Sequence, residues 1–372
     1  MGAPPGTPLG EFGKITIEEL QLAARNHGMP LEALRWPVTP VGLHYLLTHY
    51  DIPLVDAASW RLEVGGLVPR PATLTLDELR AMPAITLTTT MECAGNGRAR
   101  FDPRPLSQPW LHEAVGTATW TGVPLVRLLD RVGVGDDAVE LVFTGLDRGV
   151  ENEIEQAYER SLPVAEAARE EVLLAYHMNG TPLLPQHGYP VRLVTPGWYG
   201  MTNVKWLTRI SAVAEPFTGY QNEWAYRWRT DADDVGVPLS RMRPRSLLLP
   251  PGIPDYFTRS RVLAEGPCEL VGRAWSGWAP IEAVLVSTDG GATWDDAKVE
   301  PPDLGPWAWQ RWRHVWDAPE PGVHEICCRA RDGAGKEQPM EPEWNLGGYT
   351  NNAPHRVVVE VRPRRADEPG RP

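Results

Sequence analysis

The residues TLTTTMECAGNGR, from Thr86 to Arg98, combine a threonine-rich run that predicts a β-strand with a loop that ends it. Two glycines and an asparagine follow Cys93, and these residue types allow positive φ and close approach of the backbone. A cysteine at the start of such a loop, five residues before Arg98, can act as a nucleophile or as a ligand of a soft metal, because a nearby cation lowers the pKa of a thiol. The alternative is that Cys93 is a small buried apolar residue, as free cysteines often are.

The length and charge of the chain restrict the possible functions. A chain of 372 residues is long enough for two domains, and a net charge of −12 argues against nucleic acid or an anionic membrane surface as the main partner. No apolar run approaches the roughly 18 residues of a membrane span. The N-terminal residues lack a basic-then-apolar export signal, so we expect a cytoplasmic protein. The four cysteines are too few for a disulfide framework in a chain of this size.

Residues 1–240 are predicted to form an α+β domain, because irregular connections join its short strands and helices are few. Residues 1–30 form a Pro- and Gly-rich arm of this domain. Helices are expected after Thr75 and after Ser161, since both residue types cap helix N-termini. Asn179-Gly180 predicts a tight hairpin between two strands.

The composition changes over residues 230–245, which are first acidic and then basic, with prolines; we interpret them as a linker. Beyond it, strand patterns and turn signals such as Asp289-Gly290 recur at the spacing of a β-sandwich. Residues 241–365 are therefore predicted to be an all-β domain, and residues 366–372 a polar tail.

Four loops of the first domain carry residues suited to chemistry, and each adjoins a predicted strand. They are Cys93–Arg98, Gly145–Asp147, His187–Arg192 and Asn203–Lys205. The basic side chains suit a phosphate-bearing ligand, and the thiolate suits a soft or high-valent metal. A cofactor that carries both a metal and a phosphate would use all four loops. For Asp147 the alternative is an acid that caps its own turn.

Several separated motifs, taken in order, resemble the sulfite oxidase family of molybdenum enzymes over nearly the whole chain. They are MECAGNGR, WTGVPL, FTGLD, AYERSLP, VLLAYHMNGTPLLPQHGYPVRLVTPG, NVKWL, STDGGATW and WNLGGYTNNAPHRVVVEV.

The resemblance implies an α+β molybdenum-cofactor domain followed by an immunoglobulin-like β-sandwich that mediates homodimerisation. It implies molybdopterin with bound molybdenum as the cofactor, oxygen-atom transfer as the chemistry, and a small-molecule substrate. It places the protein's metal ligand at Cys93, the tyrosine beside the metal at Tyr158 and a substrate-binding arginine at Arg98. The cofactor contacts that it implies are His49, Asp147, His187, Arg192, Asn203, Val204 and Lys205. The sequence has no haem-binding segment, so the electron acceptor is expected to be external, such as a cytochrome.

The chain departs from the family pattern at positions where sulfite oxidisers carry arginine. Leu47 stands two residues before His49, Gly347 follows WNL, and Gly200–Thr202 replaces a GAR segment. Fixed cations bind an oxyanion through charge-assisted hydrogen bonds. The sequence therefore predicts a complete cofactor site but a weakened site for sulfite.

Three alternatives remain open at the sequence level. The first is a reductase of a small S- or N-oxide that uses the same molybdenum centre. The second is a non-enzymatic immunoglobulin-like binding protein that uses the tryptophans after residue 270. The third is a cysteine hydrolase built from Cys93, His187 and Asp147, for which the sequence around the cysteine gives no family-specific support.

Overall fold

The computed structural model describes residues 15–317 and 320–364, and these form two compact units. The described part of the first unit comprises residues 15–29, 38–242 and 344–351, and the remaining described residues form the second unit. The chain thus enters the second unit early, at residues 30–37, and returns to the first unit late, at residues 344–351. The prediction of two continuous domains that meet at residue 240 did not include these two segments. The predicted tail at residues 366–372 and the first 14 residues of the arm lie outside the described residues.

The first unit contains five short α-helices and twelve strands among its described residues. The helices are α1 (Ile17–Arg25), α2 (Leu76–Arg80), α3 (Leu125–Val132), α4 (Val164–Ala167) and α5 (Tyr220–Glu223). The strands are β1 (Arg61–Gly66), β2 (Ala72–Thr75), β3 (Ile85–Glu92), β4 (Val115–Pro124), β5 (Glu140–Glu151), β6 (Ile154–Pro163), β7 (Leu173–Met178), β8 (Thr181–Pro182), β9 (Arg192–Val194), β10 (Leu207–Val213), β11 (Arg227–Trp228) and β12 (Val237–Pro238).

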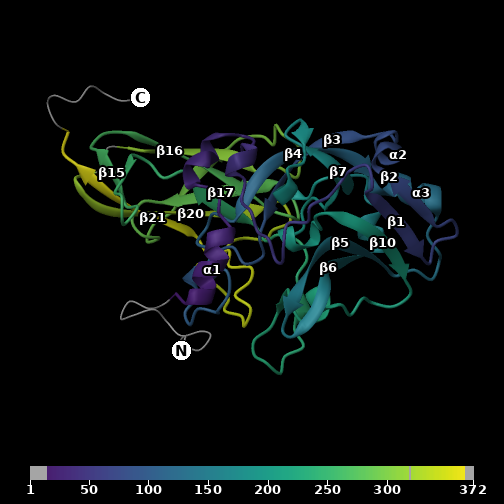
Figure 1. Cartoon of the computed structure of the whole chain (residues 1–372). Helices are drawn as coiled ribbons and strands as arrows, with labels where there is room; N and C mark the ends of the chain where they lie inside the picture. Colours follow the sequence, from purple (N-terminus) through teal and green to yellow (C-terminus); the bar gives the residue numbers. More distant parts are fainter. Residues whose placement is uncertain (1–14, 318–319, 365–372) are drawn as a thin grey trace. The chain divides into compact units, whose positions relative to one another are not determined.

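Two five-stranded sheets organise the first unit (Figure 1). One is a mixed sheet in the order β2-β1-β10-β5-β6, with β1 parallel to β10; the other is antiparallel, with β3-β4-β7-β8 in a row and β9 paired to β7. Buried side chains of both sheets, such as Leu62, Phe143 and Leu174, belong to one apolar cluster. Apolar burial of this kind holds the two sheets together and leaves the connecting loops for the site.

Local sequence signals explain most of the helix and hairpin positions. Thr75 caps α2 in a capping box with Glu78, and the predicted hairpin at Asn179-Gly180 joins β7 to β8. The helix predicted after Ser161 is present as α4, but Ser161 does not cap it: this residue lies in β6, and Pro163 stands at the N-cap position of α4. Pairing with β5 along the sheet overrides the local capping preference of the serine.

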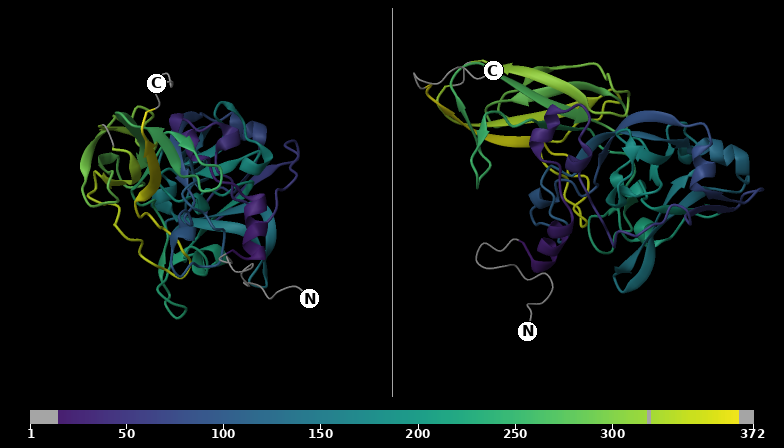
Figure 2. Two further views of the ribbon diagram at one scale, coloured as in Figure 1. Left: turned by 90° about the vertical axis from the view of Figure 1, so that its left-hand side faces the viewer. Right: turned by 45° about the horizontal axis from the view of Figure 1, so that its top comes forward.

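The second unit is all-β apart from one 3-10 turn at Leu31–Arg35, within its described residues. Its strands are β13 (Arg245–Leu248), β14 (Ile253–Pro254), β15 (Arg261–Ala264), β16 (Cys268–Trp275), β17 (Ile281–Ser287), β18 (Asp295–Val299), β19 (Gln310–Trp316), β20 (Gly322–Asp332) and β21 (His355–Arg362). They hydrogen-bond in the order β13-β16-β19-β18-β17-β20-β21-β15-β14, and the green and yellow strands of Figure 2 belong to this unit. Leu270, Trp312, Ile326 and Val359, from strands far apart in that order, share one core cluster, so the sheet folds back over itself.

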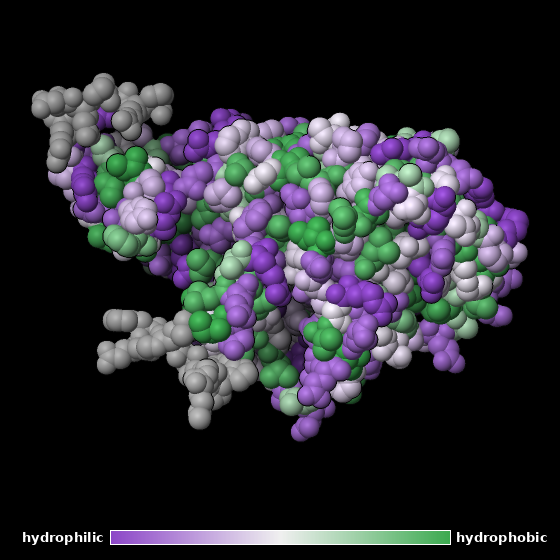
Figure 3. Space-filling view, in the orientation of Figure 1, coloured by the Kyte–Doolittle hydropathy of each residue, from purple (hydrophilic) through white to green (hydrophobic). Residues whose placement is uncertain are grey.

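The surface of the described chain mixes polar and apolar residues, as the face drawn in Figure 3 shows. Of the helices that the structure describes, none has the length and hydropathy needed to cross a membrane.

Candidate active site

Most of the predicted site residues line a single pocket of the first unit. They come from both sheets and from the loops between strands, although they are spread over more than 150 positions of the sequence. The lining residues are His44, Tyr45, Leu46, Leu47, His49, Met91, Cys93, Asp147, Tyr158, Gln186, His187, Arg192, Gly200, Met201, Asn203, Lys205 and Tyr226. The structure thus brings together eight of the ten predicted residues; Arg98 and Val204 are not in the lining.

Cys93 follows β3 directly, so the pairing of β3 with β4 fixes its position. Alternate threonines of β3 meet threonines of β4, with hydroxyl distances of 2.8 Å for Thr86–Thr121 and 3.0 Å for Thr88–Thr119. Such cross-strand pairs fix register. The amide of Cys93 then donates to the carbonyl of Ala114 at 2.9 Å. The threonine-rich run therefore places the thiol at the pocket.

Cys93 is 6% exposed, and burial raises the pKa of its thiol while the Arg98 guanidinium acts in the opposite direction. Arg98 itself is buried and bound to the backbone: Nε donates to the carbonyl of Gly347 at 3.0 Å and Nη1 to that of Gln108 at 3.1 Å. Its guanidinium also lies 5.1 Å from the ring centre of Tyr349. Arg98 therefore ties the Cys93 loop to residues 344–351, and its charge lies near the thiol without lining the pocket.

Asp147 and Tyr158 project from the neighbouring strands β5 and β6. Asp147 lies inside β5, not in a turn at the strand end as predicted, because β5 continues to Glu151 through a register shift between Thr144 and Arg148. Its Oδ1 atom is buried and has no hydrogen-bond partner, and burial raises its pKa to about 6 although Lys205 opposes the shift. The Tyr158 hydroxyl donates to the carbonyl of Met201 at 2.7 Å.

His187 and Arg192 lie on either side of a sharp turn at Gly188, which has φ of 100°. A side chain at Gly188 would meet the Cβ atoms of Lys205 and Arg192 at 3.0 and 3.1 Å, so glycine lets the two cationic residues approach. The Arg192 guanidinium donates to the carbonyls of His187 at 3.1 Å and Asn203 at 3.0 Å, and burial lowers its pKa to about 10. Burial also lowers the pKa of His187 to about 2, so this imidazole is neutral at pH 7.

Asn203, Val204 and Lys205 precede β10 and serve three different purposes. Asn203 accepts the amide of Thr195 at 2.7 Å and stabilises its own loop. Val204 is fully buried and belongs to the apolar core of the unit. Lys205 enters the pocket, where Nζ donates to the carbonyls of Leu47 at 2.9 Å and Gln186 at 3.1 Å. Burial lowers the pKa of Lys205 to about 7.

His49 faces the pocket together with residues that the sequence did not indicate. Its Nε2 atom lies 2.5 Å from the hydroxyl of Tyr226, and burial lowers its pKa to about 3. His44 lines the same pocket, and its ring lies 5.8 Å from that of His187 in an edge-to-face arrangement. His44 and Tyr45 stand within the stretch that contains His49 and could have been found from that proximity. Tyr226 lies outside every quoted motif, so no signal in the sequence pointed to it.

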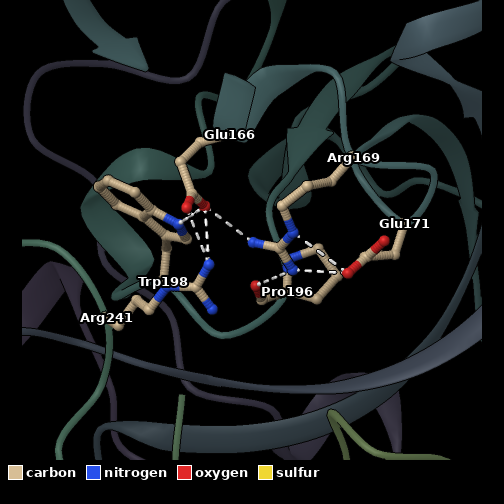
Figure 4. A network of polar contacts seen from close by, with 6 residues as sticks. All are labelled: Glu166, Arg169, Glu171, Pro196, Trp198 and Arg241. Atoms are coloured by element: carbon tan, nitrogen blue, oxygen red, sulfur yellow. Dashed lines mark hydrogen bonds and ion pairs between the residues drawn. The ribbon is translucent and has the colours of Figure 1, made fainter. Parts of the chain in front are cut away.

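A network of ion pairs and hydrogen bonds holds the segment with Pro196 and Trp198 (Figure 4), which directly precedes the pocket-lining residues Gly200 and Met201. The carboxylate of Glu166 accepts hydrogen bonds from Arg241 at 2.9 Å, from the Trp198 indole at 3.1 Å and from Arg169 at 3.0 Å. Burial raises the pKa of Glu166, but these hydrogen bonds outweigh it and the net pKa is lowered. The network therefore holds the segment before the pocket-lining residues through charged groups that are themselves well paired.

The pocket residues suit a ligand that combines a phosphate, polar ring atoms and a soft metal. Lys205 and Arg192 supply positive charge, the unpartnered oxygen of Asp147 accepts a donor, and the Cys93 thiol supplies sulfur. An unsatisfied buried carboxylate oxygen is costly unless a bound group completes its hydrogen bonding. These observations agree with a molybdopterin-type cofactor.

Comparison with known proteins gives the same assignment. Residues 49–221 match the model of the oxidoreductase molybdopterin binding domain, and residues 255–362 match that of the Mo-co oxidoreductase dimerisation domain. Sulfite oxidase of Arabidopsis thaliana is 31% identical over 87% of this chain and 88% of that protein. This chain belongs to the sulfite oxidase family. Both the predicted family and the predicted molybdenum–molybdopterin cofactor are confirmed.

Two further relatives show the extent of the likeness. Mitochondrial sulfite oxidase of Mus musculus is 33% identical over 88% of this chain, and the matching region spans 62% of that longer protein. The crystal structure of the sulfane dehydrogenase SoxCD from Paracoccus pantotrophus superposes with a TM-score of 0.76 at 25% identity, over 97% of this chain and 95% of that one. The fold is therefore that of a sulfite oxidase family member.

Proposed function

We propose that this chain is a molybdenum-dependent oxidoreductase that oxidises sulfite or a related small sulfur compound and passes the electrons to an external acceptor such as a cytochrome. The observation that carries the proposal is the pocket itself. It joins the Cys93 thiol, two buried cations and an unsatisfied carboxylate oxygen in a member of the sulfite oxidase family.

Cys93 is the residue that we assign as the protein ligand of the metal. When bound, the cofactor would supply the two-electron redox change that oxygen-atom transfer requires. A thiol that coordinates a metal is deprotonated, so binding would reverse the effect of burial on the pKa of Cys93. Arg98, held near the thiol by Gly347 and Gln108, favours the same thiolate form.

We assign contacts with the phosphate and pterin parts of the cofactor to Lys205, Arg192 and His187. The ammonium of Lys205 and the guanidinium of Arg192 both line the pocket, and each donates to two backbone carbonyls. A phosphate would complete their charge pairing in a low-dielectric site, where such pairing is strong. Asp147 and His49 add an acceptor and an imidazole to the lining.

The departures from the family pattern support a pocket with few cations for an oxyanion substrate. Leu47 and Met201 both line it. Tyr158 faces the same cavity, and its hydroxyl is held by the Met201 carbonyl. We propose that Tyr158 orients the substrate and that Arg98 provides a positive field for an anion. With apolar side chains at positions 47 and 201, this pocket would bind sulfite weakly.

We further propose that the second unit is an immunoglobulin-like sandwich that forms the homodimer. Its match to a dimerisation domain and the single core shared by strands from both ends of its sheet support this assignment.

The experiment is a metal and pterin analysis of the purified chain, followed by sulfite oxidation with ferricyanide as acceptor. We expect about one molybdenum and one pterin per chain, and turnover that depends on sulfite or another small sulfur compound. Absence of both metal and pterin would contradict the proposal.

A matched pair of lysine variants then tests the cofactor site. Lys205 lies 4.3 Å from the ring centre of Trp206, and Lys336 of the second unit lies 4.4 Å from that of Trp278. Lys205→Ala is expected to lower the pterin content, whereas Lys336→Ala removes a similar cation–π contact and should leave the pterin content unchanged. Full pterin content in Lys205→Ala would contradict the assigned role.

A further inference from the structure

Tyr349 lies in the late segment of the chain that returns to the first unit, next to the Cys93 loop. The amide of Thr350 donates to the carbonyl of Ala94 at 2.7 Å and ties this segment to the loop. Asn345 closes the turn around Tyr349, because its side chain accepts the Tyr349 amide at 2.9 Å and donates to the Tyr349 carbonyl at 2.8 Å. These backbone contacts fix the place from which the tyrosine ring projects.

The ring of Tyr349 contacts one residue of the pocket lining and one residue outside it. Its centre lies 5.4 Å from the ring centre of Tyr226, which lines the pocket, and 5.1 Å from the guanidinium of Arg98, which does not. A guanidinium this close to an aromatic face is attracted to the ring. Burial raises the pKa of Tyr349, so its phenol is neutral at pH 7. The ring therefore occupies space beside Arg98 without adding charge.

Two glycines before Tyr349 make room for this arrangement. A Cβ atom at Gly347 would overlap the Tyr349 ring, with Cδ2 only 2.6 Å away, although Gly347 lies outside the left-handed region of φ. A Cβ atom at Gly348, where φ is 60°, would lie 2.8 Å from Cγ of Arg98. The glycine that follows WNL is therefore matched to the tyrosine two residues later, because the ring fills the space in which a side chain at position 347 would begin.

We propose that Tyr349 is a specificity-determining residue: its ring shields the Arg98 guanidinium from the pocket and thereby favours a small sulfur compound with less negative charge than sulfite. Arg98 is 4% exposed and donates to the carbonyls of Gly347 and Gln108. An oxyanion gains most from a cation when a charge-assisted hydrogen bond forms directly. The ring leaves Arg98 to act on the pocket through its field alone. The substrate class rests on the proposed function, whereas the shielding by the ring does not.

The test uses sulfate as a stable oxyanion probe and measures its binding to the purified full-length chain by isothermal titration calorimetry. Tyr349→Ala opens space beside Arg98, and we expect sulfate to bind about 10-fold more tightly, as one new charge-assisted hydrogen bond would give. Tyr349→Phe keeps the ring and should bind sulfate as the wild type does. The double variant Tyr349→Ala/Arg98→Gln should lose the gain, because the cation is then absent.

Tyr176→Ala is the matched control. The guanidinium of Arg80 lies 5.5 Å from the ring centre of Tyr176, and neither residue lines the pocket. The substitution removes a similar cation–π contact and a buried ring, and it should leave the sulfate affinity unchanged. Tyr349→Leu is a second variant at the site that retains more apolar volume than alanine, and it should also bind sulfate more tightly than the wild type. Melting temperatures show which variants are folded.

Unchanged or weaker sulfate binding in folded Tyr349→Ala or Tyr349→Leu would overturn the inference. A gain of equal size in Tyr349→Phe or Tyr176→Ala would overturn it as well, because the ring beside Arg98 would then not be its cause. Metal and pterin analysis of the same wild-type sample keeps the two proposals apart. Absence of both metal and pterin would contradict the proposed function, whereas the sulfate affinities decide the role of Tyr349.

Discussion

Asp147 in the first unit and Asp332 in the second are two aspartates that are almost equally buried, at 4% and 0% exposure. Asp332 is fully used by its own unit: it accepts from the Ser276 hydroxyl at 2.7 Å and from the amides of Ala334 at 3.0 Å and Lys336 at 2.9 Å. Asp147 has an oxygen without a partner and a pKa raised to about 6. A buried carboxylate that lacks partners reduces stability, and such groups cluster where a ligand completes the structure.

The same contrast extends to the surroundings of the two residues. Around Asp147, burial lowers the pKa values of His49, His187 and Lys205, so the pocket favours neutral forms of its own side chains in the absence of a ligand. Around Asp332, the donors are two amides of its own turn and the hydroxyl of Ser276. The surroundings of Asp147 therefore suit ligand binding, whereas the hydrogen bonds of Asp332 stabilise the fold of the second unit.

The largest expected effect is on stability, at Asp332. Asp332→Ala would remove three hydrogen bonds and leave buried donors unsatisfied, which should cost about 4 kcal/mol. Calorimetry of thermal unfolding measures the loss, and the pterin content per folded chain should stay unchanged. A decrease in the free energy of unfolding below about 1 kcal/mol would show that Asp332 does not stabilise its unit, and its contrast with Asp147 would not hold.

In the cofactor-free chain, Asp147→Asn should increase the free energy of unfolding, whereas Asp332→Ala should decrease it. The ordinary pKa of the carboxyl is 3.8 and the folded value is about 6, so ionisation reduces stability progressively between these pH values and fully above them. Asparagine avoids this cost, and we expect a gain of about 3 kcal/mol at pH 8 that vanishes below pH 4. Unfolding by urea at several pH values provides the measurement, and a loss of stability at pH 8 would contradict the interpretation.

Glu166 shows that charged groups beside the pocket can be well paired. Its pKa is lowered overall, so its stabilising effect is present above the ordinary pKa of 4.5 and is lost as the pH falls through the folded value. Glu166→Gln should cost about 2 kcal/mol at pH 7 and less in acid. Glu155→Gln is the control, since the Arg148–Glu155 pair is 63% and 71% exposed and contributes little. Equal effects of both variants would show that the network does not hold the segment with Pro196 and Trp198.

The smallest expected effect concerns the strand that leads to Cys93. Thr88→Val leaves the Thr119 hydroxyl without its partner and should cost about 1 kcal/mol, whereas the double variant Thr88→Val/Thr119→Val should recover most of this loss. Urea unfolding of the wild type, Thr88→Val and the double variant measures how strongly the two hydroxyl groups contribute together to the free energy of unfolding. Additive losses would show that the pair does not fix the register.

Much of the site could be predicted because each motif carries its own local chemistry. The Cys93 loop, the cationic residues around Gly188 and the carboxylate of Asp147 could be recognised from residue types and order. Their convergence on one pocket required the fold, because the two sheets are built from interleaved parts of the chain.

The remaining features depend on contacts between residues far apart in the sequence. Val204 stands in a cofactor motif but packs into the core, since the residues of a short segment before a strand cannot all face one cavity. The return of residues 344–351 to the first unit depends on contacts such as that of Arg98 with Gly347. Tyr226 lies in a stretch without a motif, and only its unusual backbone conformation and its contact with His49 reveal it.

The central claim is that Cys93 holds the metal in this pocket, and X-ray absorption at the molybdenum edge tests it most directly. We expect the metal of the wild-type chain to have sulfur ligands from the cofactor and one sulfur ligand from the protein. In Cys93→Ser, the metal should have one sulfur ligand fewer and turnover should be lost, while the melting temperature stays that of the wild type. An unchanged number of sulfur ligands in Cys93→Ser, or retained turnover, would contradict the account.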